Sequence, residues 1–114
     1  SSAASDVYKR QRLNSQIDSM SERIEMMLEL KVDLKNSILS LEKGRMVEYY
    51  TGFLFDFNSG DLKNNLNIAG GGRYDDLINS VSNIDNIPAV GAAINLDRLE
   101  KIISSEKLIW AQYW

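Results

Sequence analysis

Two short segments of the chain carry the residue types best suited to holding a small charged molecule. Residues 49–52 read Tyr-Tyr-Thr-Gly, and residues 70–75 read Gly-Gly-Gly-Arg-Tyr-Asp. An arginine and a carboxylate can pair with the opposite charges of a zwitterion, and glycines let a ligand approach the backbone closely. Together the two segments supply the ingredients of a pocket for a small zwitterion.

The composition limits the chemistry that these segments can perform. The chain has no cysteine and no histidine, which excludes disulfides, thiol nucleophiles, imidazole bases and zinc clusters. We therefore expect no metal and no cofactor. The net charge of −3 provides no overall basic field for nucleic acid, and no run approaches the roughly 18 apolar residues of a membrane span.

The first eleven residues differ from the rest of the chain. They read Ser-Ser-Ala-Ala-Ser-Asp-Val-Tyr-Lys-Arg-Gln, with no apolar period, and look like a translated sequencing adapter. We expect residues 1–11 to be non-native and residues 12–114 to form part of one domain, a fragment whose natural start lies upstream. The alternative is a natural, flexible basic terminus. Under either interpretation the segment lies outside the packed core.

The remaining residues predict a helix followed by strands. Apolar residues recur every three or four positions from Ile17, which predicts an amphipathic helix ending near Leu30, and residues 37–43 are expected to form a short strand. Residues 48–57 are the clearest strand, and their alternation predicts two unlike faces. One face is aromatic and contains Tyr49, Thr51, Phe53, Phe55 and Phe57. The other contains Glu48, Tyr50, Gly52, Leu54 and Asp56.

The mixed face of this strand is the better candidate for binding. A glycine in mid-strand usually marks a bulge or the close approach of a ligand, so Gly52, flanked by Tyr50 and Glu48, is interpreted as the floor of a pocket. The alternative is the solvent-facing side of an edge strand.

The glycine run is interpreted as a turn. Residues 58–61 are turn formers, and residues 62–69 are expected to return as an antiparallel strand. The glycines at 70–72 then permit positive φ, and the helix expected over Arg73 to Ser80 could present its first amides to an anion. The prediction is completed by a loop over 81–87, a buried strand over 89–96 and a helix over 97–104.

The order of these motifs resembles a known family. Tyr-Tyr-Thr-Gly, then Gly-Gly-Arg-Tyr-Asp, then Pro-Ala-Val-Gly at 88–91 and Leu-Asp-Arg-Leu at 96–99, is similar to the histidyl-tRNA-synthetase-like catalytic core. That core is shared by the synthetase and by the regulatory subunit of ATP phosphoribosyltransferase. The resemblance implies an α+β fold, an antiparallel sheet with flanking helices, corresponding to the C-terminal part of a class II synthetase core.

The resemblance also implies a histidine site. Arg45 stands where the family has an arginine near the histidine carboxylate, Glu48 falls on an acidic position, and Tyr50 and Tyr74 match tyrosines of the pocket. Asp75 is expected to orient its neighbours. The complete set of candidates for histidine binding is Arg45, Glu48, Tyr50, Gly52, Gly71, Gly72, Arg73 and Tyr74. Arg98 would contact a nucleotide only in the synthetase.

Two departures from the synthetase pattern favour the regulatory subunit. Met46 and Asn95 stand where the synthetase has glycines, and a side chain at Asn95 would obstruct the close approach of ATP. A synthetase also continues into an anticodon-binding domain, whereas this chain ends soon after Ile103. The terminal aromatics Trp110, Tyr113 and Trp114 are expected to pack on the core, or else on a partner.

The resemblance therefore implies a cytoplasmic, non-catalytic subunit with no catalytic residues of its own. Its partner would be the catalytic subunit of ATP phosphoribosyltransferase, the first enzyme of histidine biosynthesis, and histidine would be its effector. The alternative is a fragment of histidyl-tRNA synthetase, which would activate histidine with ATP and charge tRNA, the one case with a nucleic-acid partner. A third interpretation is a small structural domain with a decayed pocket.

Overall fold

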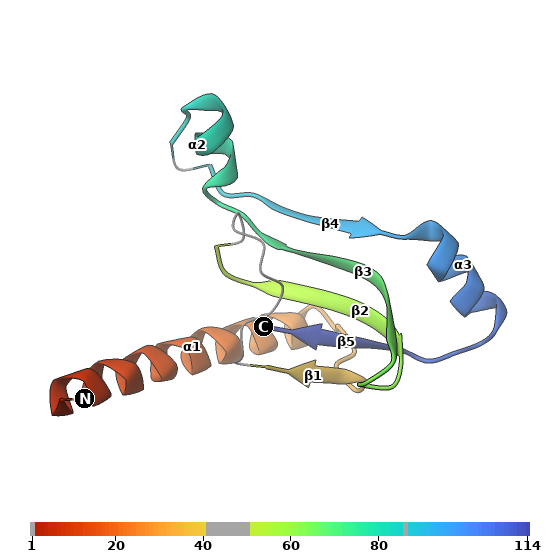
Figure 1. Cartoon of the computed structure of the whole chain (residues 1–114), viewed down its shortest axis with the longest axis horizontal. Coiled ribbons are helices and arrows are strands. Elements are labelled where there is room, and N and C mark those ends of the chain that lie inside the picture. The colour runs from red at the N-terminus through yellow and green to blue at the C-terminus, as the bar shows by residue number, and fades with distance from the viewer. Residues whose placement is uncertain (1, 41–50, 86) are drawn as a thin grey trace. The chain divides into compact units, whose positions relative to one another are not determined.

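The computed structural model describes residues 2–40, 51–85 and 87–114. The chain divides into two compact units, Ser1–Lys35 and Asn36–Trp114, which are described separately. The first unit is mainly a helix, and the second holds a sheet with two further helices (Figure 1).

The first unit contains α1, which spans Ala3–Glu29. Its end agrees with the predicted end near Leu30, but the helix begins well before Ile17. The side chain of Ser2 caps the helix by accepting a hydrogen bond from the Ser5 amide, and Asp6 complements the helix dipole in the first turn. The opening residues thus form a helix through capping and intrinsic propensity, without an apolar period, and their side chains are exposed or half-exposed.

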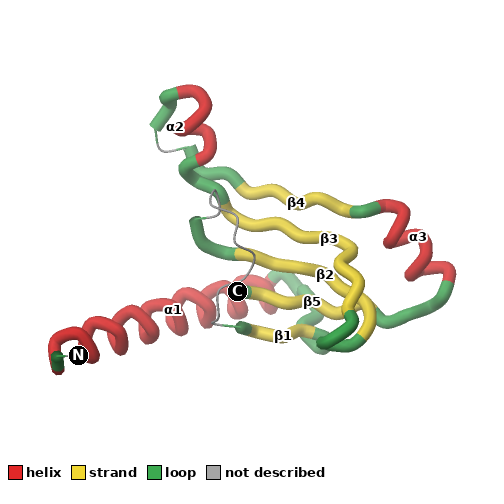
Figure 2. Tube along the Cα trace, in the orientation of Figure 1, coloured by secondary structure: helices red, strands yellow, loops and turns green. Residues whose placement is uncertain are grey.

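The second unit is built on a mixed sheet of five strands. The strands are β1 (Ser37–Leu39), β2 (Leu54–Gly60), β3 (Asn65–Arg73), β4 (Val90–Ile94) and β5 (Ile109–Tyr113). Their order across the sheet is β1-β5-β2-β3-β4 (Figure 2). β1 runs parallel to β5, and every other neighbouring pair is antiparallel. The α+β class is confirmed, whereas the expectation of a purely antiparallel sheet is wrong at the β1–β5 edge.

Two helices lie at opposite ends of this sheet. α2 (Leu77–Ser82) connects β3 to β4, and α3 (Leu96–Ser104) follows β4 (Figure 1). The predicted helix over 97–104 is confirmed as α3. Ile102 is buried, whereas Leu96 and Ile103 are exposed. The helix predicted from Arg73 begins only at Leu77, because Arg73 still belongs to β3.

The predicted hairpin is confirmed, but its turn lies later in the sequence. Residues 48–50 of the predicted strand lie outside the described residues, and β2 spans Leu54–Gly60, through residues expected to form the turn. The turn instead follows Asp61, whose Oδ1 accepts hydrogen bonds from the amides of Lys63 (3.0 Å) and Asn64 (2.6 Å). Gly60 has a φ of 96°, a conformation that glycine adopts without strain.

The triple-glycine segment is a strand, not a turn. Gly70, Gly71 and Gly72 lie in β3, paired with β2 on one side and β4 on the other. Gly71 pairs with Phe55, and a Cβ built on Gly71 would lie 2.9 Å from Phe55 Cζ. The ring of Phe55 thus covers the space above Gly71, and hydrogen bonding to two neighbouring strands keeps the glycines extended.

The two edge strands of the sheet also differ from the prediction. β4, predicted to be buried, is an edge strand with Val90 and Ile94 exposed. The predicted strand over 37–43 appears as β1 at 37–39, and residues 41–43 lie outside the described part of the chain. The terminal aromatics pack within this unit, because β5 is an internal strand, Tyr113 is buried, and Trp110 Nε1 donates to the Gly60 carbonyl at 2.8 Å.

Candidate functional site

The strand register gives the sheet two chemically different faces. Paired residues of neighbouring strands point to the same side, so Gly72 of β3 shares a side with Leu54 of β2 and Gly91 of β4, and Gly70 shares it with Asp56 and Ala93. We call this side the glycine face and define it by Gly70, Gly72 and Gly91. The opposite side, the aromatic face, is defined by Phe53, Phe55, Phe57 and Tyr113.

The aromatic face is a continuous set of ring contacts. The ring of Phe55 lies 5.8 Å from that of Phe53 and 5.6 Å from that of Phe57, centroid to centroid. Phe53 in turn stacks on Tyr113 at 5.9 Å. The predicted aromatic face is therefore confirmed for its phenylalanines. Burial raises the pKa of the Tyr113 hydroxyl, and a hydrogen bond with Ser37 lowers it in part.

Tyr74 lies on the glycine face, against Gly91. A Cβ built on Gly91 would meet Tyr74 Oη at 2.5 Å and Cε1 at 3.2 Å, so the ring occupies the space where a side chain would be. The Tyr74 amide donates to the carbonyl of Ala89 at 2.8 Å, which attaches its backbone to the residue before β4. The tyrosine that follows β3 is thus placed over a position without a side chain.

The loop that carries Tyr74 is held by Asp75. The Nε of Arg73 donates to both carboxylate oxygens of Asp75, at 2.9 and 2.7 Å, and the Ala89 amide donates to Oδ1 at 3.2 Å. The Asp75 amide donates to the hydroxyl of Thr51 at 3.1 Å, and the Thr51 amide donates to the Arg73 carbonyl at 2.9 Å. These contacts match the expectation that Asp75 orients its neighbours.

Thr51 is a contributor that sequence reasoning missed. It was placed on the aromatic face by alternation, but β2 is irregular before Leu54, and the Thr51 hydroxyl instead accepts from the loop after β3. Its position beside Gly52 in the Tyr-Tyr-Thr-Gly segment was the available signal. A hydroxyl next to a strand end is suited to bonding backbone groups of a neighbouring loop.

Apart from Gly52, the structure separates the predicted histidine-site residues into three groups. Arg45, Glu48 and Tyr50 lie outside the described residues. Gly72 and Tyr74 share the glycine face, and Arg73 is paired with Asp75 beside them. Gly71 faces the opposite, aromatic side, since alternate residues of a strand point in opposite directions. The glycine turn that was to bring Gly71 and Gly72 together toward an anion is therefore wrong.

Gly52 is one of the exposed candidates among the described residues. It is exposed, and a Cβ built on it would meet nothing within 4 Å. Nothing in the described structure therefore requires a glycine at this position for packing. That Gly52 borders a pocket stays a prediction.

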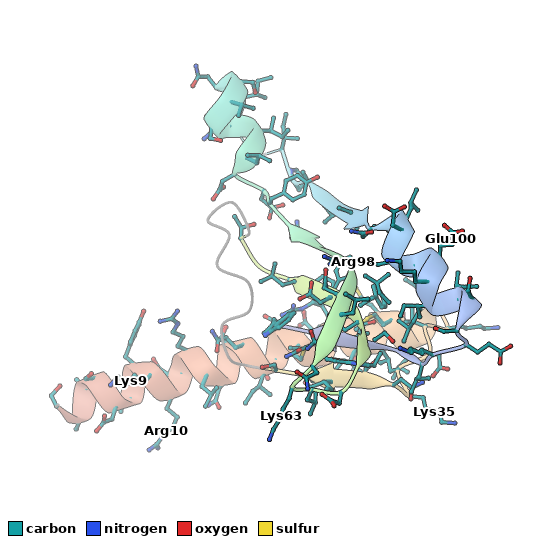
Figure 3. The ribbon with its side chains drawn as sticks, turned by 45° about the vertical axis from the view of Figure 1, so that its right-hand side comes forward. Lys9, Arg10, Lys35, Lys63, Arg98 and Glu100 are labelled. Carbon is teal, nitrogen blue, oxygen red and sulfur yellow. The ribbon has the colours of Figure 1, made fainter. Side chains whose placement is uncertain are left out.

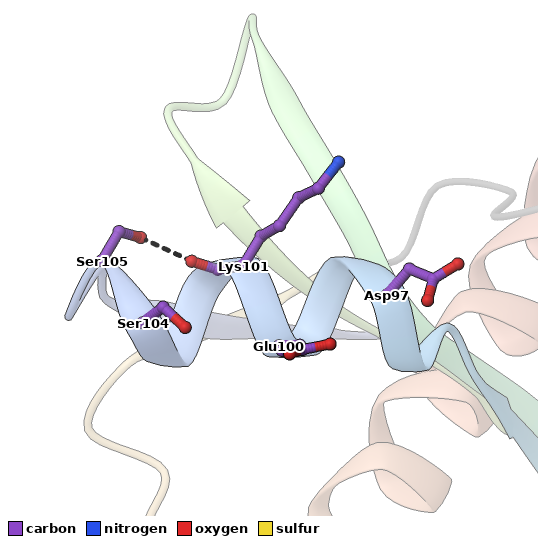
Figure 4. Close-up of a pocket in the computed structure, with 5 residues that line it drawn as sticks. All are labelled: Asp97, Glu100, Lys101, Ser104 and Ser105. Atoms are coloured by element: carbon purple, nitrogen blue, oxygen red, sulfur yellow. Dashed lines mark hydrogen bonds between the residues drawn. The ribbon is translucent and has the colours of Figure 1, made fainter.

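A separate hollow lies on the outer side of α3. It is lined by Asp97, Glu100, Lys101, Ser104 and Ser105, and includes none of the predicted site residues (Figure 4). The hydroxyl of Ser105 donates to the Lys101 carbonyl at 2.9 Å, which closes the end of the helix. The described residues include no group of three or more metal-ligating side chains, and none of the described helices is long and apolar enough to cross a membrane.

Comparison with known proteins identifies the family. A family model described as histidyl-tRNA synthetase matches residues 1–99. The chain belongs to the histidyl-tRNA synthetase family. The matched range includes residues 1–11, and the foreign origin expected for that segment stays a prediction.

Similar curated proteins of this family carry another name. The chain is 34% identical over 85 residues, 75% of its length, to a protein of Brucella anthropi named ATP phosphoribosyltransferase regulatory subunit. Proteins of the same name from Brucella ovis and Brucella canis are 28% identical over 95 residues, 83% of the chain. The chain spans about a quarter of the length of these relatives, 23% and 25%. No solved structure gives a significant match.

Two hydrogen bonds hold the start of α3. The Asn95 side chain caps α3 by accepting a hydrogen bond from the Arg98 amide at 3.0 Å, so Asn95 has a structural role. Arg98 lies where α3 meets the sheet, and its Nη1 donates to the Asn67 carbonyl at 2.9 Å (Figure 3). The cap and this hydrogen bond both tie α3 into the fold.

Proposed function

We propose that the chain is part of a cytoplasmic, non-catalytic regulatory subunit of ATP phosphoribosyltransferase, which binds histidine and controls the catalytic subunit. The observation that carries this proposal is the name shared by its relatives in three Brucella species, one of them 34% identical to the chain. In this function the histidine-activating chemistry of the family is absent and the binding site is retained for sensing.

The glycine face is the proposed location of the histidine site. Histidine would lie with its carboxylate near Arg45 and its amine or imidazole among Glu48, Tyr50 and Tyr74. The described geometry supports this location because Tyr74 is held on this face by its contact with Gly91. The space beside Gly52, which precedes β2, is open. Gly72 would let histidine approach the backbone of β3 closely. Gly71 is left out of the site because it faces Phe55.

Arg73 has a supporting role in this proposal. Because its Nε already bonds both oxygens of Asp75, it holds the loop beside Tyr74 rather than providing the main charge for a ligand carboxylate. That charge is assigned to Arg45. Histidine occupancy would then act on the partner by differential affinity: histidine binds one state of the assembly more tightly and thereby favours it.

The capped junction at Asn95 supports the absence of nucleotide chemistry. A glycine at this position leaves the backbone free for close approach, whereas the Asn95 side chain here occupies the first turn of α3 through its bond to the Arg98 amide. The second departure, Met46, lies outside the described residues. No catalytic residue is assigned to the chain.

The second candidate function is histidyl-tRNA synthetase. It is favoured by the description of the family model, which matches 99 residues of the chain, and by the presence of Arg98 where the synthetase has an ATP-contacting arginine. The same histidine site would then serve activation with ATP, and tRNA would be the partner.

One experiment separates the two functions. In the full-length regulatory subunit that the proposal implies, adding the protein to the catalytic subunit should raise phosphoribosyltransferase activity, and histidine should reduce it. Histidine-dependent exchange of pyrophosphate into ATP should be absent; its detection would establish the synthetase instead. Arg45→Ala should weaken histidine binding roughly ten- to a hundredfold by removing a charge-assisted contact.

Arg98→Ala is the matched control. Under the regulatory function it leaves histidine affinity unchanged, because Arg98 bonds the Asn67 carbonyl and is not one of the residues proposed to bind histidine. Under the synthetase function it abolishes pyrophosphate exchange. A change in histidine affinity equal to that of Arg45→Ala would contradict the assignment of both residues.

A further inference from the structure

Gly91 and Tyr74 form a contact that only glycine permits. The Tyr74 hydroxyl would lie 2.5 Å from a Cβ at position 91, and the ring atoms Cε1 and Cζ would lie at 3.2 and 3.3 Å. Distances below 3.0 Å between carbon and another heavy atom are not tolerated, so an added methyl group must displace one of the two partners.

The backbones on both sides of this contact cannot easily separate. Gly91 pairs with Gly72 in the β3–β4 ladder, and the Tyr74 amide donates to the Ala89 carbonyl, two residues before Gly91. A second hydrogen bond, which the Asp75 carboxylate accepts from the Ala89 amide, connects the same two segments. Because main-chain hydrogen bonds hold both segments at this distance, the tyrosine ring is the part that would move.

We propose that Gly91 is a positioning residue that sets the ring of Tyr74 over the glycine face and thereby sets the size of the histidine site. This inference rests on the proposed function for the ligand but not for the contact itself. A side chain at position 91 would rotate the ring away from β4 and change the wall that Tyr74 presents to the imidazole or amine of histidine.

The contact can be tested without any ligand. In the 114-residue chain with ring-labelled tyrosine, Gly91→Ala should shift the NMR signals of Tyr74 and leave those of Tyr113, which lies on the aromatic face, unchanged. Unchanged Tyr74 signals would overturn the inference. If Gly91→Ala does not fold, adding Tyr74→Ala should restore folding, because it removes the group that clashes; failure of that rescue would also overturn it.

The effect on binding is tested by a double-mutant cycle with histidine as the probe. Gly91→Ala should weaken histidine binding by roughly two- to a hundredfold, the range that contacting residues span. In the Tyr74→Ala background the same change should have no further effect. Equal losses in the two backgrounds would show that Gly91 acts independently of Tyr74 and would overturn the positioning role.

The two proposals fail in different ways. If the unsubstituted chain does not bind histidine, the sensing function fails at this site, and the role of Gly91 in setting pocket size fails with it. The Tyr74 signals then decide separately whether Gly91 places the ring. If histidine binds and Gly91→Ala changes neither affinity nor signals, the proposed function stands and the inference about Gly91 is wrong.

Discussion

The two faces of the sheet, the aromatic face and the glycine face, are built on opposite principles. On the aromatic face, Phe55 packs between Phe53 and Phe57 and covers Gly71. On the glycine face, positions Gly70, Gly72 and Gly91 carry no side chains, and the ring of Tyr74 occupies the space beside Gly91. The first arrangement packs aromatic rings against one another, and the second leaves the space of a side chain to the ring of one tyrosine.

This difference shows why glycines of two neighbouring strands have different tasks. Gly71 is glycine because Phe55 and the backbone of β4 occupy the space of a side chain, which is a packing requirement. Gly91 is glycine because a tyrosine of the proposed site occupies that space. The presence of glycine in the sequence does not distinguish the two cases. The face to which each position points, which alternates along a strand, does distinguish them.

The largest effect is expected at Gly71. A Cβ there would collide with the carbonyl oxygen of Gly91 and lie 2.8 Å from the Cα of Ala92, both of them backbone atoms that cannot rotate away. Gly71→Ala should therefore destabilise the fold by about 3 kcal/mol, as overpacking against backbone does. Denaturant unfolding measures the loss.

Gly52→Ala is the matched control for that change. A Cβ at position 52 would meet nothing within 4 Å, so the free energy of unfolding should change by less than about 0.5 kcal/mol. Equal losses at Gly52 and Gly71 would mean that the register between β3 and β4 is not the one described.

The next effect concerns Phe55 on the aromatic face. Truncating a fully buried phenylalanine costs about 3–5 kcal/mol, and because Phe55 is half-buried, Phe55→Ala should cost about 2 kcal/mol. Histidine affinity should not change, since the ring lies on the side of the sheet away from Tyr74. A loss of affinity without a loss of stability would contradict the separation of the two faces.

A smaller effect is expected at Asp75, which supports the glycine face from the loop. Asp75→Ala removes the acceptor for Arg73 Nε and for the Ala89 amide, and should cost about 1 kcal/mol, because the pair is partly exposed to solvent. Thermal unfolding at two salt concentrations checks this value. A loss that does not depend on salt would assign the effect to the Ala89 bond rather than to the ion pair.

The smallest effect is the pH dependence caused by Tyr113. Because burial raises the pKa of its hydroxyl in the folded state, the folded chain holds this proton more tightly than the unfolded chain. The stability from this group is complete below the unfolded pKa and is lost as the pH rises through the folded pKa. Tyr113→Phe should remove that alkaline loss, which unfolding curves at increasing pH would show.

Local patterns predicted much of this fold. The helical period gave α3, the alternation of phenylalanines gave the aromatic face, and the turn-forming residues gave the β2–β3 hairpin. Each of these features depends on residues close together in the sequence. Asp75, which the resemblance implied to orient its neighbours, accepts hydrogen bonds from Arg73 and from the Ala89 amide.

The wrong predictions share a different cause. The extended conformation of Gly70, Gly71 and Gly72 depends on β2 and β4, which lie outside the glycine run itself. The place of β5 between β1 and β2 depends on pairing with residues about fifty or more positions earlier, which no local period encodes. The early start of α1 depends on the Ser2 cap rather than on an apolar stripe.

The proposed histidine site stays a prediction, and the register corrects one part of it. The Tyr-Tyr-Thr-Gly and Gly-Gly-Arg-Tyr-Asp motifs predicted that Gly71 and Gly72 act together, although the strand turns them to opposite faces. The contact between Tyr74 and Gly91 joins positions seventeen apart through the β3–β4 ladder, so only the register shows it.

Calorimetric titration of histidine into the chain and into its Gly52→Val variant tests the central claim most directly. Because space beside Gly52 is open, valine there should fill part of the site without disturbing the fold. We predict that the unsubstituted chain binds histidine and that Gly52→Val weakens binding by roughly tenfold or more, about 1.4 kcal/mol, with unchanged denaturant unfolding. Equal histidine affinity in the two proteins would contradict the claim that this side of the sheet is the sensing site.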